Sequence, residues 1–179
     1  MSKKINIKRL CICLISIVAL VVIDQLTKVW AVNTLKDKAP IQLINNVLEL
    51  HYLPNGNTGA AFGMLQGKQW LFLIIAVVIS AGLLFIINSF PDDKKYRYAI
   101  VIMTFIIAGG IGNMIDRVSL KYVIDFIYIS IINFPIFNVA DMYVSVGTFF
   151  LIILSFVYYK EEDFAIVENA FKNLFKVKK

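Results

Sequence analysis

The chain has 179 residues, of which 59% are hydrophobic and only 17% are charged. A soluble domain of this length carries more charge, so the composition excludes an ordinary water-soluble fold and indicates an integral membrane protein. The formal net charge of +6 would suit a nucleic-acid-binding protein, but the basic residues gather at the ends of apolar segments. That placement is typical of topology signals, and we expect no nucleic-acid partner.

The first apolar segment predicts a membrane helix over residues 10–32. Its basic start resembles a secretory signal peptide, but a small-residue cleavage site is missing and the apolar pattern resumes after Asp24. Asp24 and Lys28 are four residues apart and share one face of this helix. Two interpretations stay open: a structural ion pair near the outer interface, with Lys28 extended toward water, or a direct role in shaping an active site.

Three further apolar segments complete a prediction of four membrane helices, over residues 69–89, 96–116 and 138–159. The N-terminal tail, the turn at 90–97 and the C-terminal tail hold four, three and five Lys or Arg residues, against five in the two other connecting segments. Because positive charge marks the cytoplasmic side, both termini are expected in the cytoplasm. We therefore expect one membrane domain over residues 1–160 and a basic cytoplasmic tail at 161–179.

The two segments expected on the outer side differ in character. Residues 33–68 are too polar and too interrupted to span, and their partial alternation of apolar residues predicts a small hairpin or bent sheet over the membrane face. Residues 117–137 are apolar but include Lys121 and Asp125. We interpret this second segment as a loop or short amphipathic piece that rests at the interface.

The uncommon polar residues of several segments fall at one predicted depth, near the outer leaflet. They are Asp24, Lys28, Asn113, Arg117, Asp125, Asn138 and Asp141. On the third helix Gly109, Asn113 and Arg117 follow one another at steps of four, with Asp116 beside them. Because polar groups are costly inside a membrane, their convergence indicates a functional site.

Asp125 and Asp141 suggest acid–base chemistry. The single histidine, His51, stands apart, and no serine lies in a nucleophile motif. If the two carboxyl groups lie close together in a partly desolvated place, one keeps its proton while the other is ionised. Such a pair can activate water and support the oxyanion that develops, which is the chemistry of aspartic peptidases and needs no metal or cofactor.

From the residues alone, three alternatives remain open. A hard metal ion could bind the two carboxylates. A small proton-coupled membrane carrier could use intramembrane carboxylates as a relay. A structural packing subunit would use Gly109 and Gly112 only for helix contact.

Five short motifs, taken together and in this order, resemble the bacterial lipoprotein signal peptidase family, signal peptidase II. They are Asp24-x-x-Thr27-Lys28, Asn57-Thr58-Gly59-Ala60-Ala61-Phe62, Gly109-Gly110-Ile111-Gly112-Asn113-Met114-Ile115-Asp116-Arg117, Val123-x-Asp125-Phe126 and Phe137-Asn138-x-Ala140-Asp141. The resemblance covers residues 10–160. It implies an all-α membrane protein of four transmembrane helices with a small extracytoplasmic β-cradle and an interfacial flap loop.

The same resemblance implies removal of the signal peptide from diacylglyceryl-modified prolipoproteins, by a cut just before the lipidated cysteine. It makes Asp125 and Asp141 the catalytic pair. The residues that it assigns to the substrate site are Asn57, Gly109, Asn113, Arg117 and Asn138, with Asp24, Lys28 and Asp116 as structural support. The partners it implies are prolipoproteins and membrane lipids, for a monomer in the bacterial cell membrane with its active site near the outer face.

Overall fold

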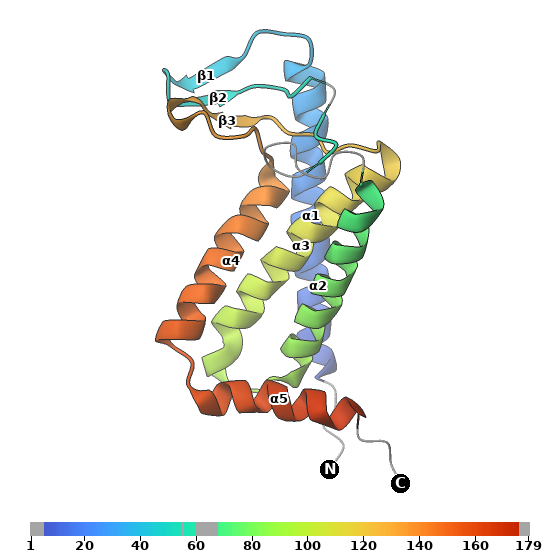
Figure 1. Cartoon of the computed structure of the whole chain (residues 1–179), viewed down its shortest axis with the longest axis vertical. Helices are drawn as coiled ribbons and strands as arrows, with labels where there is room; N and C mark the ends of the chain where they lie inside the picture. Colours follow the sequence, from blue (N-terminus) through green and yellow to red (C-terminus); the bar gives the residue numbers. More distant parts are fainter. Residues whose placement is uncertain (1–5, 55, 60–67, 176–179) are drawn as a thin grey trace.

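The computed structural model describes residues 6–54, 56–59 and 68–175. Four long helices run side by side in it (Figure 1), namely α1 (Ile7–Leu35), α2 (Gln69–Ser89), α3 (Arg97–Ser119) and α4 (Val139–Val157). Each helix is long and apolar enough to cross a membrane. For α3 the candidate span includes the short 3-10 turn η2 (Lys94–Tyr96) before it. A helix can cross a membrane because it satisfies its own backbone hydrogen bonds. The prediction of four membrane helices is confirmed.

The predicted helix boundaries need correction at three helices. α1 is three residues longer at each end than the predicted 10–32. At its start, the Asn6 side chain caps the helix by accepting a hydrogen bond from Arg9 N at 3.0 Å. At its other end, the last residue, Leu35, is buried. α3 continues to Ser119 rather than ending at residue 116. α4 begins at Val139, since Asn138 is its N-cap and not part of its first turn.

A small antiparallel sheet lies at one end of the bundle, which we call the sheet end (Figure 1). Its strands, in spatial order, are β1 (Ile41–Ile44), β2 (Leu48–Leu50) and β3 (Ile127–Ile129). The hairpin predicted in the first outer segment is present as β1 and β2, joined by a turn in which Asn46 has φ 55°. Asn tolerates this left-handed conformation better than most residues.

The second outer segment was interpreted as a loop or an amphipathic piece, and the structure corrects this. Its residues Ile127–Ile129 form β3, which pairs with β2 so that Leu48 lies opposite Ile129, and the 3-10 turn η3 (Ser130–Ile132) follows. The physical reason is that β1 pairs with only one edge of β2, and the backbone groups of the other edge can pair with a neighbouring extended segment. The second outer segment is therefore partly fixed to the sheet.

Backbone pairing continues beyond the regular strands and fixes the chain around Asp125. Leu53 N donates to Asp125 O at 3.0 Å, and Asn57 and Val123 exchange both of their backbone hydrogen bonds at 2.9 Å. A residue held on both sides in this way has little freedom to move away. The first outer segment thus positions the second.

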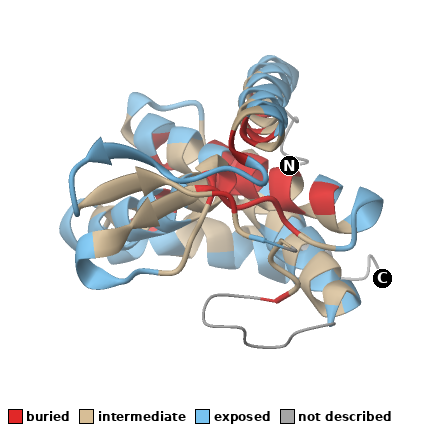
Figure 2. Cartoon of the chain, turned by 90° about the horizontal axis from the view of Figure 1, so that it is seen from above, coloured by how far each residue is buried: buried red, intermediate tan, exposed pale blue. Residues whose placement is uncertain are grey.

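The buried residues concentrate along α3, which contacts each of the other three membrane helices. Figure 2, a view from above, shows buried residues toward the middle of the molecule and exposed residues around them. Gly109 allows the close approach of α3 and α4, because a Cβ there would lie 2.4 Å from Ala140 O. Gly147 does the same from α4, where a Cβ would lie 2.8 Å from Ile106 Cγ1.

A buried ammonium group joins the helices near the sheet end. The Lys28 side chain is only 1% exposed, and its Nζ lies 2.9 Å from Asp24 Oδ2 and 3.0 Å from Asp116 Oδ2. It also donates to Asn113 Oδ1 at 3.0 Å, so all three of its hydrogens have acceptors. The ion pair with Asp24 is present, but the interpretation in which Lys28 extends toward water is wrong, because the two carboxylates and the amide draw it inward.

The same cluster holds α4 and the chain before Asp125. Ala140 N donates to Asp24 Oδ1 at 2.9 Å, and Ile124 N donates to Asp116 Oδ2 at 3.2 Å. Gly112 makes room for it, since a Cβ there would lie 2.5 Å from Asp24 Oδ2. Helices α1, α3 and α4 are therefore joined at one charged centre.

Residues beyond 160, predicted as a basic tail, instead form the helix α5 (Glu161–Phe175) as far as the structure describes them. It crosses the opposite end of the bundle, which we call the α5 end (Figure 1). Its Asp163 accepts from Lys95 Nζ and from Tyr96 OH, both at 2.6 Å. Burial opposes ionisation, but hydrogen bonds from the Lys160 backbone, Lys95 and Tyr96 outweigh it and lower the pKa of Asp163 to about 2.

Replacing Lys28 with Met is expected to reduce stability by about 3–5 kcal/mol, because it leaves two carboxylates buried without a cation. The measurement is the yield of folded protein and its thermal midpoint in detergent. Lys38→Met, at an exposed lysine beyond the end of α1, is the matched control. Equal stability of the two variants would show that the cluster does not hold the bundle together.

Candidate active site

Asp125 is fully buried between the sheet and the start of α4. Its Oδ2 accepts from Asn57 Nδ2 at 2.9 Å, and its Oδ1 accepts from Asn138 Nδ2 at 2.7 Å. Each oxygen therefore has an amide donor, and the two amides come from segments about 80 residues apart in sequence. Such a carboxyl group is oriented before any substrate arrives.

Asp141 lies in the first turn of α4 and is half-buried. Asn138 and Asp141 form a capping box: Asp141 N donates to Asn138 Oδ1 at 2.9 Å, and Asn138 N donates to Asp141 Oδ2 at 3.1 Å. Asn113 Nδ2 donates to the other oxygen, Oδ1, at 2.7 Å. The motif residues at the start of α4 thus both begin the helix and orient a carboxylate.

Two asparagines connect the carboxyl groups to each other and to the buried cation. Asn138 contacts Asp125 through its side-chain amide and Asp141 through its cap hydrogen bonds. Its Nδ2 also donates to Asn113 Oδ1 at 3.0 Å, the oxygen that Lys28 contacts. One hydrogen-bonded network therefore joins α1, α3, α4 and the segment before β3.

The electrostatic surroundings favour a shared proton. Burial and the negative charge of Asp141 raise the pKa of Asp125 to about 7, against the hydrogen bonds from Asn57 and Asn138 and the charge of Lys28. Two carboxyl groups that interact this strongly titrate as a pair. Near neutral pH such a pair holds one proton, which suits general acid and general base roles at once.

A cavity of about 500 Å³ opens beside Asp141. Its lining combines four polar side chains with aromatic and aliphatic ones from α2, α4 and the segment after η3. The lining residues include Asn57, Phe72, Arg117, Phe134, Phe137, Asp141 and Ser145. A cavity of this kind suits an apolar peptide segment that must also be held by its backbone.

Arg117 supplies the positive charge of this cavity. Its guanidinium carbon lies 4.7 Å from the centre of the Phe72 ring, and its Nη2 donates to Gly59 O at 3.2 Å. Its Nε is buried and has no hydrogen-bond partner among the described residues. A buried donor without a partner is unusual and remains available to a ligand.

The other predicted site residues lie behind the cavity wall. Asn113 and Asn138 contact the two carboxyl groups but do not line the cavity, and Gly109 is buried against α4. Residues 60–62 of the second motif lie outside the described residues. Within the described part of the chain, no three His, Cys, Asp or Glu side chains gather as metal ligands.

Sequence reasoning missed three residues that the structure brings to this region. Gln25 donates to Asp24 Oδ2 at 3.1 Å and to Asp116 Oδ1 at 3.0 Å, and its place beside Asp24 was an available signal. Phe72 and Ser145 line the cavity. They carry no signal in a single sequence, because aromatic and small polar residues are common in membrane helices that have no site.

Comparison with known proteins identifies the family. A family model described as signal peptidase (SPase) II matches residues 16–157. The lipoprotein signal peptidase of Clostridioides difficile (strain 630) is 43% identical over 137 residues, which cover 76% of this chain and 89% of that protein. The lipoprotein signal peptidase of Streptococcus pyogenes serotype M5 is 39% identical over 150 residues, which cover 84% of this chain and 94% of that protein.

The fold comparison agrees with the family match. A solved structure described as a bacterial membrane enzyme has a TM-score of 0.72 and 33% sequence identity to this chain, and the match covers 90% of this chain and 97% of that one. Sequence, fold and the geometry of the polar network therefore lead to one assignment. The chain belongs to the signal peptidase II family and is a multi-pass membrane protease.

Proposed function

We propose that this protein is an aspartic endopeptidase that removes the signal peptide from diacylglyceryl-modified prolipoproteins, cutting just before the lipidated cysteine. The observation that carries the proposal is the pair Asp125 and Asp141, both bonded to Asn138, with Asp141 in the lining of the cavity that holds Arg117. The relatives named lipoprotein signal peptidase support the substrate class. The carrier alternative has no support from these comparisons.

In the proposed reaction the two carboxyl groups divide the acid and base roles. The ionised carboxylate takes a proton from a water molecule, whose oxygen attacks the scissile carbonyl. The protonated carboxyl group donates a hydrogen bond to the developing oxyanion. As the C–N bond breaks, a proton passes to the leaving amine, and the pair ends with one proton as it began.

Other residues hold the substrate in this proposal. Arg117 and Asn57 bind backbone carbonyls of the peptide, since both offer amide or guanidinium donors to the cavity. The aromatic wall, which includes Phe72, Phe134 and Phe137, accepts the apolar part of the substrate. Asn113 and Asn138 orient the carboxyl groups through their hydrogen bonds. Gly109 permits the close packing of α4 on α3.

The positive-inside rule supports a placement in the bacterial cell membrane with both termini in the cytoplasm. The sheet end then faces outward, and the catalytic pair lies near the outer surface. We propose residues 1–160 as the membrane domain, α5 and the rest of the chain as a cytoplasmic extension, and a monomer as the working form.

Asp125→Asn and Asp141→Asn should each lower cleavage of a lipid-modified prolipoprotein roughly 10² to 10⁴-fold, because an amide cannot exchange the proton. The assay uses purified protein, with thermal midpoints to verify folding. Asp37→Asn is the matched control, since Asp37 is exposed on the same end of the bundle and Asn tolerates its φ of 60°. Full activity in either dyad variant would disprove the proposed catalytic pair.

The cleavage rate should fall as the pH rises through about 7, because the pair then loses its one proton and both carboxylates are ionised. The rate falls with rising pH because the raised pKa of Asp125 keeps the proton on the pair at pH values where an ordinary aspartate has lost it. The measurement is kcat/KM as a function of pH, with the concentrations of detergent and lipid held constant. A rate that stays constant well above pH 7 contradicts the shared proton.

Arg117→Gln should raise KM about tenfold, because a charge-assisted hydrogen bond to a peptide carbonyl is lost, while kcat changes less. Steady-state kinetics with a lipid-modified substrate peptide measure both constants. Lys68→Gln removes one positive charge near the start of α2 and serves as the control. A pure loss of kcat with unchanged KM would instead assign Arg117 to the chemical step.

A further inference from the structure

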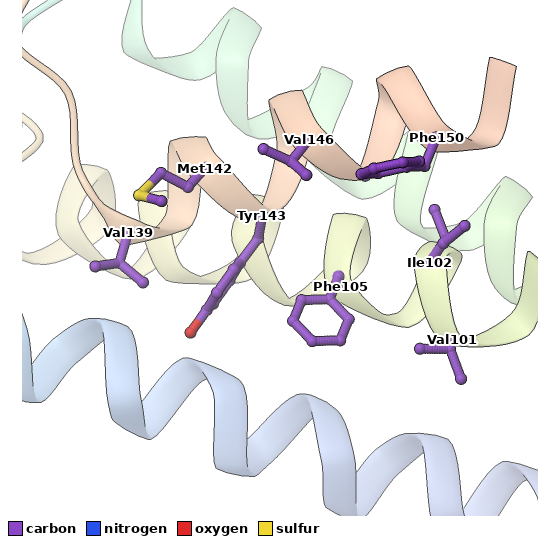
Figure 3. Close-up of a pocket in the computed structure, with 9 residues that line it drawn as sticks. Val101, Ile102, Phe105, Val139, Met142, Tyr143, Val146 and Phe150 are labelled. Atoms are coloured by element: carbon purple, nitrogen blue, oxygen red, sulfur yellow. The ribbon is translucent and has the colours of Figure 1, made fainter. Parts of the chain in front are cut away.

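A second cavity, of about 410 Å³, lies beside the candidate active-site cavity along α4, and Met142 and Val146 line both. Figure 3 shows its lining side chains, which come only from α3 and α4, with the ribbon of α1 running alongside. They include Val101, Ile102, Phe105, Tyr143 and Phe150. No charged residue lines it, and we call it the apolar groove.

On the side that faces α1, a hydrogen bond bounds the apolar groove at the sheet end. There Ala140 N donates to Asp24 Oδ1 at 2.9 Å, which ties α4 to α1 beside the buried Lys28. Among the described residues, no other hydrogen bond or ion pair joins these two helices.

Toward the α5 end the apolar groove continues into a polar cavity of about 450 Å³, which we call the basic mouth. Val101 lines both, and it lies one helical turn above Arg97, the first residue of α3. The charged residues that line the basic mouth are Lys8, Arg9, Asp92, Asp93 and Arg97. Ile12 and Ile100 continue the apolar wall between them.

Three of these five charges already have partners in the fold. Arg9 donates to Phe90 O and Pro91 O, both at 2.8 Å, and lies 3.5 Å from Asp92. Asp93 accepts from Lys95 N at 2.8 Å and caps η2. These contacts close the chain between α2 and α3.

The remaining two charges are cations without partners. No hydrogen bond or ion pair within the described residues involves the side chain of Lys8 or of Arg97. Both line the basic mouth, which shares Val101 with the apolar groove. Basic pockets between membrane helices are typical binding sites for phosphate head groups.

We propose that the apolar groove and the basic mouth together bind one anionic phospholipid from the leaflet at the α5 end. Its phosphate lies on Lys8 and Arg97, and one acyl chain follows α3 past Val101 toward Tyr143. The groove runs from residue 150 to residue 139 of α4, a rise of about 16 Å, which accommodates most of a chain. The bound lipid would fill the apolar groove between α3 and α4.

The test is photolabelling of the full-length protein in phosphatidylcholine vesicles that contain a trace of phosphatidylglycerol with a diazirine on its acyl chain. Labelled peptides from α3 and α4 that line the groove should exceed those from the lipid-facing side of α2. Val101→Trp blocks the junction and should abolish most of this labelling. Val77→Trp on α2 is the matched control, because both valines are 54% exposed.

The head-group contact is tested separately. Replacing Lys8 and Arg97 together by Gln should raise the concentration of unlabelled phosphatidylglycerol that displaces the label about fivefold per cation. Replacing Lys94 and Lys172 by Gln removes the same charge from the α5 end. This control should leave that concentration unchanged, since neither residue lines the basic mouth. Equal effects of the two pairs would reduce the site to general surface charge and overturn the proposal.

A final arm distinguishes a membrane lipid from the substrate. An excess of a peptide with a lipid-modified cysteine should leave the labelling of the apolar groove unchanged, because the proposed phosphate contacts, Lys8 and Arg97, lie at the α5 end and do not line the active-site cavity. Displacement of the label by this peptide would assign the groove to the substrate's lipid and contradict the proposal. Labelling spread evenly over α2, α3 and α4 would contradict it as well.

Discussion

The structure depends on one buried ammonium group. Lys28 carries a positive charge into a region that would otherwise hold only carboxylates and amides, and three acceptors surround it. An ion in a membrane interior is tolerated only when such partners are complete. Because Asp24 also binds the first turn of α4 and Asp116 binds the chain before Asp125, the position of both candidate catalytic residues follows from this contact.

The same cation influences the chemistry from a distance. It contacts Asn113, which contacts Asp141, so its charge favours ionisation of the pair, while burial of Asp125 opposes it. The balance leaves a carboxyl group that titrates near neutral pH rather than near pH 4.

Helix α4 separates two environments that serve different purposes. Part of its surface lines the polar cavity with Arg117 and Asp141, another part lines the apolar groove, and Met142 and Val146 line both. Gly109 and Gly147 permit the close packing of α4 on α3 beside these cavities. At the far end, α5 holds the turn between α2 and α3 through Asp163, so both ends of the bundle are closed by charged contacts.

By itself the sequence determined the number of membrane helices, the hairpin and the convergence of polar residues, because apolar length and helical spacing are local properties. It did not determine that 127–129 joins the hairpin or that 161–175 is a helix across the bundle, because both depend on a partner surface formed by distant segments. It also left open whether Lys28 extends toward water or helps to shape a site. Only the tertiary structure decided this, since the direction of a long side chain is set by acceptors on other helices, and Asp116 and Asn113 are about 85 residues away in sequence.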